Sequence, residues 1–218
     1  MKPIDNVFHA VSDAQAEGLD LSHLVVTAWS AAQITKLDRA LVRGLGQPAG
    51  VSVDDVIPTA IIGTVLDIVG ERGKDSRQLM DGEDLRECED EYIELIRKAS
   101  DTKDPNFLER RRRFIKAAID LSLRARLDGV TIEDKFYPTV KPIGMALSFA
   151  TEVADYYADY KQQNNLLDAA DLLAAELVPI EHCELCFLDR GGIPPLGITA
   201  LRRLLPNAFF CTVYADSR

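Results

Sequence analysis

Apolar residues in the first 73 positions alternate between short continuous runs and helical spacing. The run LVVTAW is rich in β-branched residues and predicts a buried parallel strand, and Ser30 directly after it is a typical helix N-cap. Alternating strands and helices indicate a parallel α/β sheet. The elements expected here are a helix at 5–18, a strand at 24–29, a helix at 31–46, a strand at 51–56 and a helix from Pro58.

The pattern changes after Gly73, where amphipathic helical spacing replaces the short runs. Tyr137-Pro138 and Lys141-Pro142 predict a loop within this region. We therefore expect residues 74–164 to form a helical insertion. The helices expected beyond Gly73 lie at 81–98, 106–127, 143–162 and 165–177.

The final stretch, LCFLDRGGIPPLGITALRRLLPNAFFCTVYADSR, predicts strand, helix and strand, with the strands at 184–188 and 208–214. Asp189 and Asp216 come at the tips of these strands, where parallel α/β enzymes hold metal and phosphate. The expected fold is α/β and predominantly helical. Its core is formed by 1–73 and 165–218, a partial parallel sheet interrupted by the insertion.

Composition narrows the function classes. The 218 residues carry a net charge of −10, which argues against general nucleic-acid binding and leaves room for an acidic face that meets a basic partner. No apolar run is long enough to span a membrane, and the first residues lack the features of a secretory signal. We expect a cytoplasmic protein with no membrane association.

Four cysteines occur, and Cys183 and Cys186 form a CxxC pair. A zinc site would need two more ligands, and the apolar LCFL run favours a buried strand with reduced thiols. No nucleophile–base pair or metal-ligand spacing appears elsewhere. We expect no metal and no cofactor.

Two charge runs each allow two interpretations. Arg110, Arg111, Arg112 and Arg113 spread around one helix, either as a solvated surface whose arginine stems cover apolar groups or as an anion or nucleic-acid contact. The acidic helix at 81–98 is either a solvated face or a surface for a protein partner. Its partner-facing candidates are Glu83, Asp84, Glu87, Asp90, Glu91 and Glu94.

Four segments together resemble the first motor domain of UvrD/Rep-type superfamily-one DNA helicases. These segments are AVSDAQAEGLDLSHLVVTAWSAAQITKLDRAL (10–41), TAIIGTVLDIV (59–69), LLDAADLLAAEL (166–177) and the strand–helix–strand stretch at 184–218. They occur in the family's order and span most of the chain. The resemblance implies a RecA-like core.

The resemblance also implies site residues. Thr27, Trp29 and Ser30 lie where the family's Thr-rich segment contacts single-stranded DNA, and Trp29 is placed to stack on a base. Asp189 matches the metal-linked aspartate, and Asp216 matches the acid of the next strand.

Departures from the family pattern remove its chemistry. No GxxxxGK[ST] phosphate loop occurs, and the chain starts at about the point where that motif would finish. Arg190 replaces the glutamate that polarises water, and an arginine cannot accept a proton. TAII is apolar where the family has a histidine. We therefore expect no ATPase activity.

Three functions follow from this comparison. The first is a non-catalytic protein that binds a protein partner and inhibits or scaffolds a DNA-processing or defence complex, as products of phages or mobile elements do. The second is a single-stranded nucleic-acid-binding module. The third is one half of a split ATP-dependent helicase. Because the family's central strand precedes the phosphate loop, we also expect an altered sheet order or a homodimer.

Overall fold

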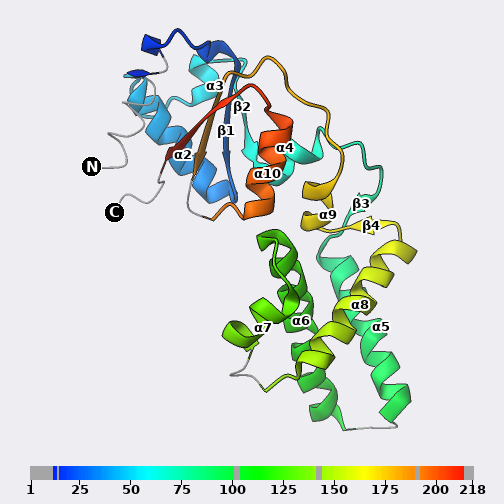
Figure 1. Ribbon diagram of the computed structural model, residues 1–218. Helices are drawn as coiled ribbons and strands as arrows, with labels where there is room; N and C mark the ends of the chain where they lie inside the picture. The colour runs from blue at the N-terminus through cyan, green and yellow to red at the C-terminus, as the bar shows by residue number, and fades with distance from the viewer. Residues whose placement is uncertain (1–11, 14, 101–103, 141–143, 190–191, 214–218) are drawn as a thin grey trace. The chain divides into compact units, whose positions relative to one another are not determined.

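Two units make up the computed structural model (Figure 1), which describes residues 12–13, 15–100, 104–140, 144–189 and 192–213. An α/β unit contains Met1–Lys74 and Ala175–Arg218, and a helical unit contains Asp75–Ala174. The fold is α/β and predominantly helical, which confirms the predicted class. The predicted helix at 5–18 lies mostly outside the described residues.

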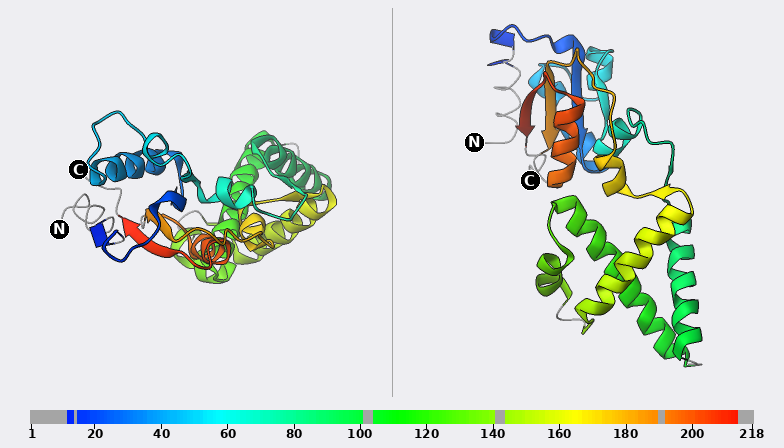
Figure 2. Two further views of the ribbon diagram at one scale, coloured as in Figure 1. Left: turned by 90° about the horizontal axis from the view of Figure 1, so that it is seen from above. Right: turned by 45° about the vertical axis from the view of Figure 1, so that its right-hand side comes forward.

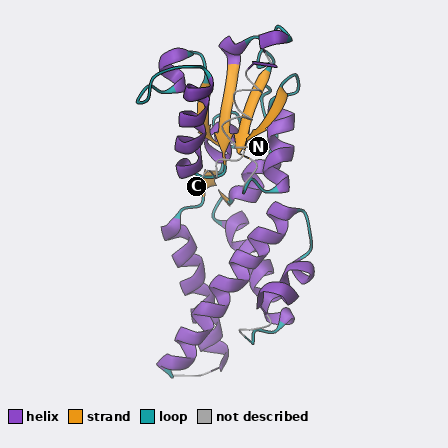
Figure 3. Cartoon of the chain, turned by 90° about the vertical axis from the view of Figure 1, so that its left-hand side faces the viewer, coloured by secondary structure: helices purple, strands orange, loops and turns teal. Residues whose placement is uncertain are grey.

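A four-stranded parallel sheet forms the centre of the α/β unit, with the order β2-β1-β5-β6 (Figure 3). The two central strands pair from Leu24 with Leu185 to Thr27 with Leu188. Every residue of both central strands is buried, as in a parallel sheet covered on both faces. The strands are β1 (Leu24–Ala28), β2 (Ile61–Thr64), β5 (Leu185–Asp189) and β6 (Phe209–Val213).

Helices cover both faces of this sheet, with α2 on one side and α4 and α10 on the other (Figures 1 and 2). Strand side chains that alternate toward α2, such as Val26 and Phe187, form one core cluster with Leu37 and Leu41 of that helix. The helical segments of this unit are η1 (Leu21–His23), α2 (Ala31–Gly44), α3 (Val53–Val56), α4 (Val65–Gly70) and α10 (Pro195–Leu204).

The outer strands β2 and β6 are the edges of the sheet among the described residues. Phe209, the first residue of β6, is 59% exposed. An edge strand with an exposed aromatic residue suits pairing with another chain. The predicted altered order or self-association stays a prediction.

The segment from residue 51 to 70 differs from its prediction. Val53–Val56, expected as a strand, is the short helix α3, because the Asp38 carboxylate accepts hydrogen bonds from the Ser52 hydroxyl (3.0 Å) and the Val53 amide (2.9 Å). The helix expected from Pro58 is instead strand β2 followed by α4. Thr64 starts α4 through a capping box with Asp67, which leaves Ile61–Thr64 to pair with β1.

The helical unit packs three long helices around one apolar cluster (Figure 1). Tyr92 of α5, Ile115 of α6 and Tyr157 of α8 are buried in it. Among the described residues, no helix is both long enough and apolar enough to cross a membrane. The elements are β3 (Gln78–Leu79), α5 (Gly82–Ser100), α6 (Pro105–Asp128), α7 (Ile132–Val140), α8 (Leu147–Gln163), β4 (Leu166–Leu167) and α9 (Ala169–Ala174).

The prediction of a loop at Tyr137-Pro138 is wrong, because Pro138 lies inside α7. Thr131 and Asp134 cap the start of this helix through a 2.7 Å hydrogen bond between their side chains. Phe136 is buried in the apolar cluster. The cap and this burial offset the backbone hydrogen bond that a proline removes.

A buried ion cluster ties the ends of α6 and α8 to the start of α9. The Lys161 ammonium, 5% exposed, donates to Asp168 Oδ2 at 2.6 Å and to Asp171. Arg126 of α6 donates to the same two carboxylates, at 2.7 Å to Asp168. Asp168 Oδ1 also accepts the amide of Ala170 at 2.9 Å and so caps α9.

This cluster explains why the boundary of the insertion differs from the expected one. Residues 165–177, predicted as a helix of the α/β core, form strand β4 and the shorter helix α9. Strand β4 pairs with β3, Leu167 opposite Leu79. The segment as far as Ala174 therefore belongs to the helical unit.

Removal of the buried ammonium should destabilise the protein strongly. We expect Lys161→Met to lower the free energy of unfolding by about 3–5 kcal/mol, because the buried carboxylate of Asp168 and the half-buried one of Asp171 both lose a partner. Arg97→Met is the matched control, since Arg97 and Glu94 form an exposed pair, and should cost at most about 1 kcal/mol. Urea unfolding of both variants measures the difference, and equal effects would contradict a structural role for Lys161.

Stability should also fall in acid through Asp171. Burial by itself raises the pKa of this carboxyl, but the hydrogen bond and charge of Lys161, the Asp168 amide and the charge of Arg126 outweigh it and lower the pKa from 3.8 to about 2. Because the folded-state pKa is depressed, the contribution is present above pH 3.8 and is lost as the pH falls toward 2. The stability gap between wild type and Asp171→Asn, measured by urea unfolding, should close over this range.

Candidate functional site

The strand ends at which site residues were predicted lie side by side at the carboxyl end of the sheet. Strand β5 ends at Asp189, which is opposite Val213 of β6, and the neighbouring Leu188 is opposite Thr27 of β1. Asp189 is only 3% exposed. Asp216, the second predicted motif acid, lies outside the described residues.

Thr27 is fully buried between two strands, opposite Gly63 on one side and Leu188 on the other. Its hydroxyl has no hydrogen-bond partner among the described residues. A side chain with no exposed surface cannot touch a bound strand of DNA. The predicted nucleic-acid contact by Thr27 is therefore wrong in this conformation.

Ser30 and Trp29 follow β1 and have different environments. The Ser30 hydroxyl and amide both bond to Gln33 Oε1, at 2.9 and 3.0 Å, in the capping box that starts α2. The hydrogen bonds of Ser30 are therefore those of a helix N-cap. Trp29 is half-buried, so part of this residue remains accessible.

Gly192 lies close to Gln33 near the start of α2. Gly192 has a φ of 109°, and a Cβ at this position would lie 3.3 Å from Gln33 Nε2. A glycine meets both the left-handed backbone and the close approach. Gly192 thus lies beside the capping box that Gln33 forms with Ser30.

The cysteines of the CxxC pair are buried beside the sheet. Cys183 Sγ lies 3.3 Å from the Leu185 carbonyl oxygen, and Cys186 is part of β5. Burial raises the pKa of both thiols and raises the pKa of Cys211 to about 11, which keeps all three protonated at neutral pH. In the described part of the chain, no three His, Cys, Asp or Glu side chains are placed to hold a metal ion.

The four arginines of α6 point in different directions, as a helix requires. Arg112 pairs with Asp90 of α5 and lies 3.9 Å from Glu89. Arg113 is 3.5 Å from Glu109 on its own helix. These contacts leave Arg110 and Arg111 as the predicted nucleic-acid candidates of this run without an acidic partner among the described residues.

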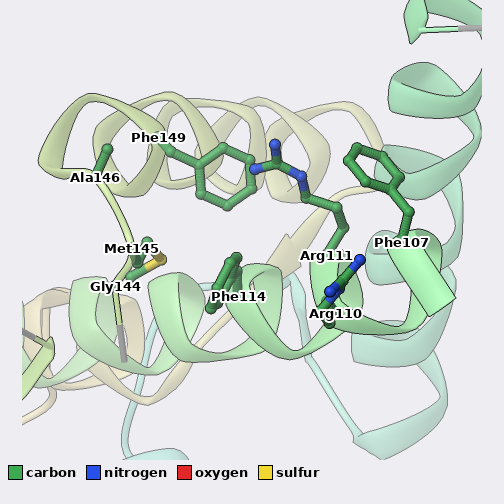
Figure 4. Close-up of a pocket in the computed structure, with 8 residues that line it drawn as sticks. All are labelled: Phe107, Arg110, Arg111, Phe114, Gly144, Met145, Ala146 and Phe149. Atoms are coloured by element: carbon green, nitrogen blue, oxygen red, sulfur yellow. The ribbon is translucent and has the colours of Figure 1, made fainter. Parts of the chain in front are cut away.

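Arg110 and Arg111 line a pocket of about 330 Å³ at the amino ends of α6 and α8 (Figure 4). The Arg111 guanidinium carbon lies 5.0 Å from the ring centre of Phe107 and 5.2 Å from that of Phe149. Figure 4 shows the Arg111 side chain projecting between these two rings. The remaining lining residues are Phe114, Gly144, Met145 and Ala146.

Sequence reasoning identified the arginines but missed the aromatic partners. Phe107 and Phe114 are seven residues apart on α6, a spacing that places both on one face of the helix, and this signal was available from the sequence. Phe149 comes from α8 and reaches the pocket only through the packing of the two helices.

Most of the predicted partner-facing acids of α5 already have partners within the helical unit. Glu91 accepts a hydrogen bond from Tyr156 at 3.1 Å, and Glu94 accepts two from Arg97. Asp84 accepts the Asp81 amide at 2.9 Å at the start of the helix. The exposed members are Glu83, Glu87, Asp90, Glu91 and Glu94.

Comparison with known proteins adds no identity: no known protein family matches this sequence, and no curated protein matches it.

Replacement of the Thr27 hydroxyl should stabilise the fold. We expect Thr27→Val to raise the free energy of unfolding by about 1 kcal/mol, because it removes a buried polar atom without a partner. Thr64→Val is the matched control and should cost about 1 kcal/mol, because Thr64 caps α4. Thermal unfolding measures both, and destabilisation by Thr27→Val would show that the hydroxyl has a partner.

Proposed function

We propose that this chain is a non-catalytic, helicase-like protein that acts by binding another protein. The order of strands and helices in its α/β unit, interrupted by a helical unit, is consistent with the resemblance to the first motor domain of UvrD/Rep-type helicases. By this proposal the protein inhibits or scaffolds a DNA-processing or defence complex.

The burial of Asp189 is the observation that carries the proposal. A carboxylate that binds a metal or polarises water must face the ligand, yet this one is 3% exposed at the end of β5. The next residue is Arg190, which cannot act as the base that the family places there. Among the described residues, packed strands whose predicted motif acid Asp189 is buried support binding rather than catalysis.

Charge supports a protein partner over a nucleic acid. The chain carries 35 acids against 25 bases. A nucleic-acid surface needs unpaired cations along the phosphate backbone. Arg112 and Arg113, two of the four arginines in the predicted contact, are instead near carboxylates of the same unit.

Single-stranded nucleic-acid binding is the second candidate, and the accessibility of Trp29 favours it. This residue follows β1 at the position where the resemblance places a stacking aromatic, and it is half-buried rather than part of the closed core. Base stacking on such a ring contributes about 1–3 kcal/mol.

The two candidates can be separated by fluorescence, because Trp29 is the only tryptophan in the sequence. We expect an oligothymidylate to leave its emission unchanged, since the proposal assigns this ring no stacking role. Trp29→Phe provides the blank for the signal. Saturable quenching would support nucleic-acid binding and contradict the proposal that the chain acts by binding a protein.

The same sample tests the absence of catalysis. Calorimetric titration with Mg-ATP should give no binding heat at millimolar nucleotide, and phosphate release should equal that of buffer. Saturable micromolar binding would reveal a phosphate site and overturn the non-catalytic part of the proposal.

A further inference from the structure

We infer that the arginine–phenylalanine pocket at the amino ends of α6 and α8 binds a peptide segment of a partner protein in which a carboxylate lies next to an apolar side chain. The inference rests on the proposed protein-binding function and gives that function a surface and a ligand chemistry. The pocket residues that carry it are Phe107, Arg110, Arg111, Phe114, Met145 and Phe149.

The positive charge at this pocket is not neutralised within the described chain. Neither Arg110 nor Arg111 lies within ion-pair distance of a described acid, although Arg112 and Arg113 on the same helix have such neighbours. A guanidinium without a counter-ion attracts a carboxylate, and two adjacent guanidinium groups can donate hydrogen bonds to both of its oxygens. Charge complementarity therefore selects an anionic group.

The pocket presents one of these guanidinium groups in a fixed direction. Phe107 and Phe149 hold Arg111 between their rings through cation–π contacts. Such a held arginine loses little side-chain freedom when it binds a carboxylate. The Arg111 side chain is therefore held in its binding orientation before an anion binds.

The other lining residues favour a ligand in which an apolar side chain lies next to the carboxylate. Phe114 and Met145 are apolar lining residues, and Figure 4 shows Phe114 between Met145 and the two arginines. A volume of about 330 Å³ is at the small end of ligand sites and suits one or two side chains. Aromatic and arginine residues together are typical of the anchoring centre of protein interfaces.

Single-stranded nucleic acid fits this surface less well. Such ligands require a track of cations that follows several phosphates. Among the described residues, the arginines of this run that have no acidic neighbour end after Arg111, because Arg112 is paired with Asp90 of the acidic helix α5. A short segment with one carboxylate meets this local charge without repulsion along its length.

A displayed library of random peptides, selected on the purified full-length chain, tests this inference. We expect recovered peptides to combine Asp, Glu or a free carboxyl terminus with an adjacent aromatic or aliphatic residue. Fluorescence anisotropy with the synthesised peptide should show that Arg110→Ala weakens binding about tenfold or more, because a charge-assisted hydrogen bond is lost. Arg113→Ala removes the same charge outside the pocket and should leave affinity unchanged.

A double-mutant cycle provides the sharper readout. Replacement of the peptide's acidic residue by its amide should weaken binding to wild type but have little further effect on Arg110→Ala. Arg111→Lys keeps the charge and loses the planar group, so it should also weaken binding. Arg110 is exposed, which makes Arg110→Ala informative even where Arg111 variants fail to fold.

The outcomes distinguish this inference from the proposed function. Peptides that bind wild type and Arg110→Ala equally would overturn the pocket assignment and leave the protein-binding function standing. Failure to recover any peptide, together with oligothymidylate binding that Arg110→Ala abolishes, would overturn both.

Discussion

The helical unit depends on the pairing of a buried ammonium, Lys161, with two carboxylates, Asp168 and Asp171. An ammonium in this environment is tolerated only with charged partners, so the chain after α8 must turn back to supply them. Arg126 binds the same carboxylates from the end of α6. One polar cluster thereby fixes the carboxyl ends of α6 and α8 with respect to each other.

The opposite ends of the same two helices form the arginine–phenylalanine pocket. Phe107 and Arg111 lie near the start of α6, and Phe149 lies near the start of α8. A shift of one helical turn, about 5.4 Å, would separate the Arg111 guanidinium from the Phe149 ring. The alignment set by the ion cluster is therefore also the condition for the pocket.

The sequence predicted those elements whose signals are local. LVVTAW, the capped helix after Ser30 and the long amphipathic helices appear close to where they were expected. Ile61 and Ile62 satisfied both strand and helix spacing, and only the pairing with β1 decided between them. The short β4 strand depends on β3, a partner far away in sequence, and could not be predicted from its own two residues.

The site was predictable to a similar extent. Divergence of the four arginines follows from helical geometry alone. Which of them lacks a counter-ion depends on Asp90 and Glu109, and the rings that hold Arg111 come from two helices. Burial of Thr27 in a sheet covered on both faces also follows from tertiary packing, which no resemblance to a motif can supply.

The insertion of the helical unit has a consequence for the order of folding. Leu24 of β1 must find Leu185 of β5, and the entropy lost in closing such a loop grows with its length. The insertion begins and ends at neighbouring points, since Gly73 bridges to Leu177 and the Lys74 amide bonds to the Glu176 carbonyl at 3.0 Å. If the insertion folds first, its two ends are already held together. The loop that the sheet must then close contains only residues 25–74 and 175–184, so β1 and β5 are separated by a much shorter length of flexible chain.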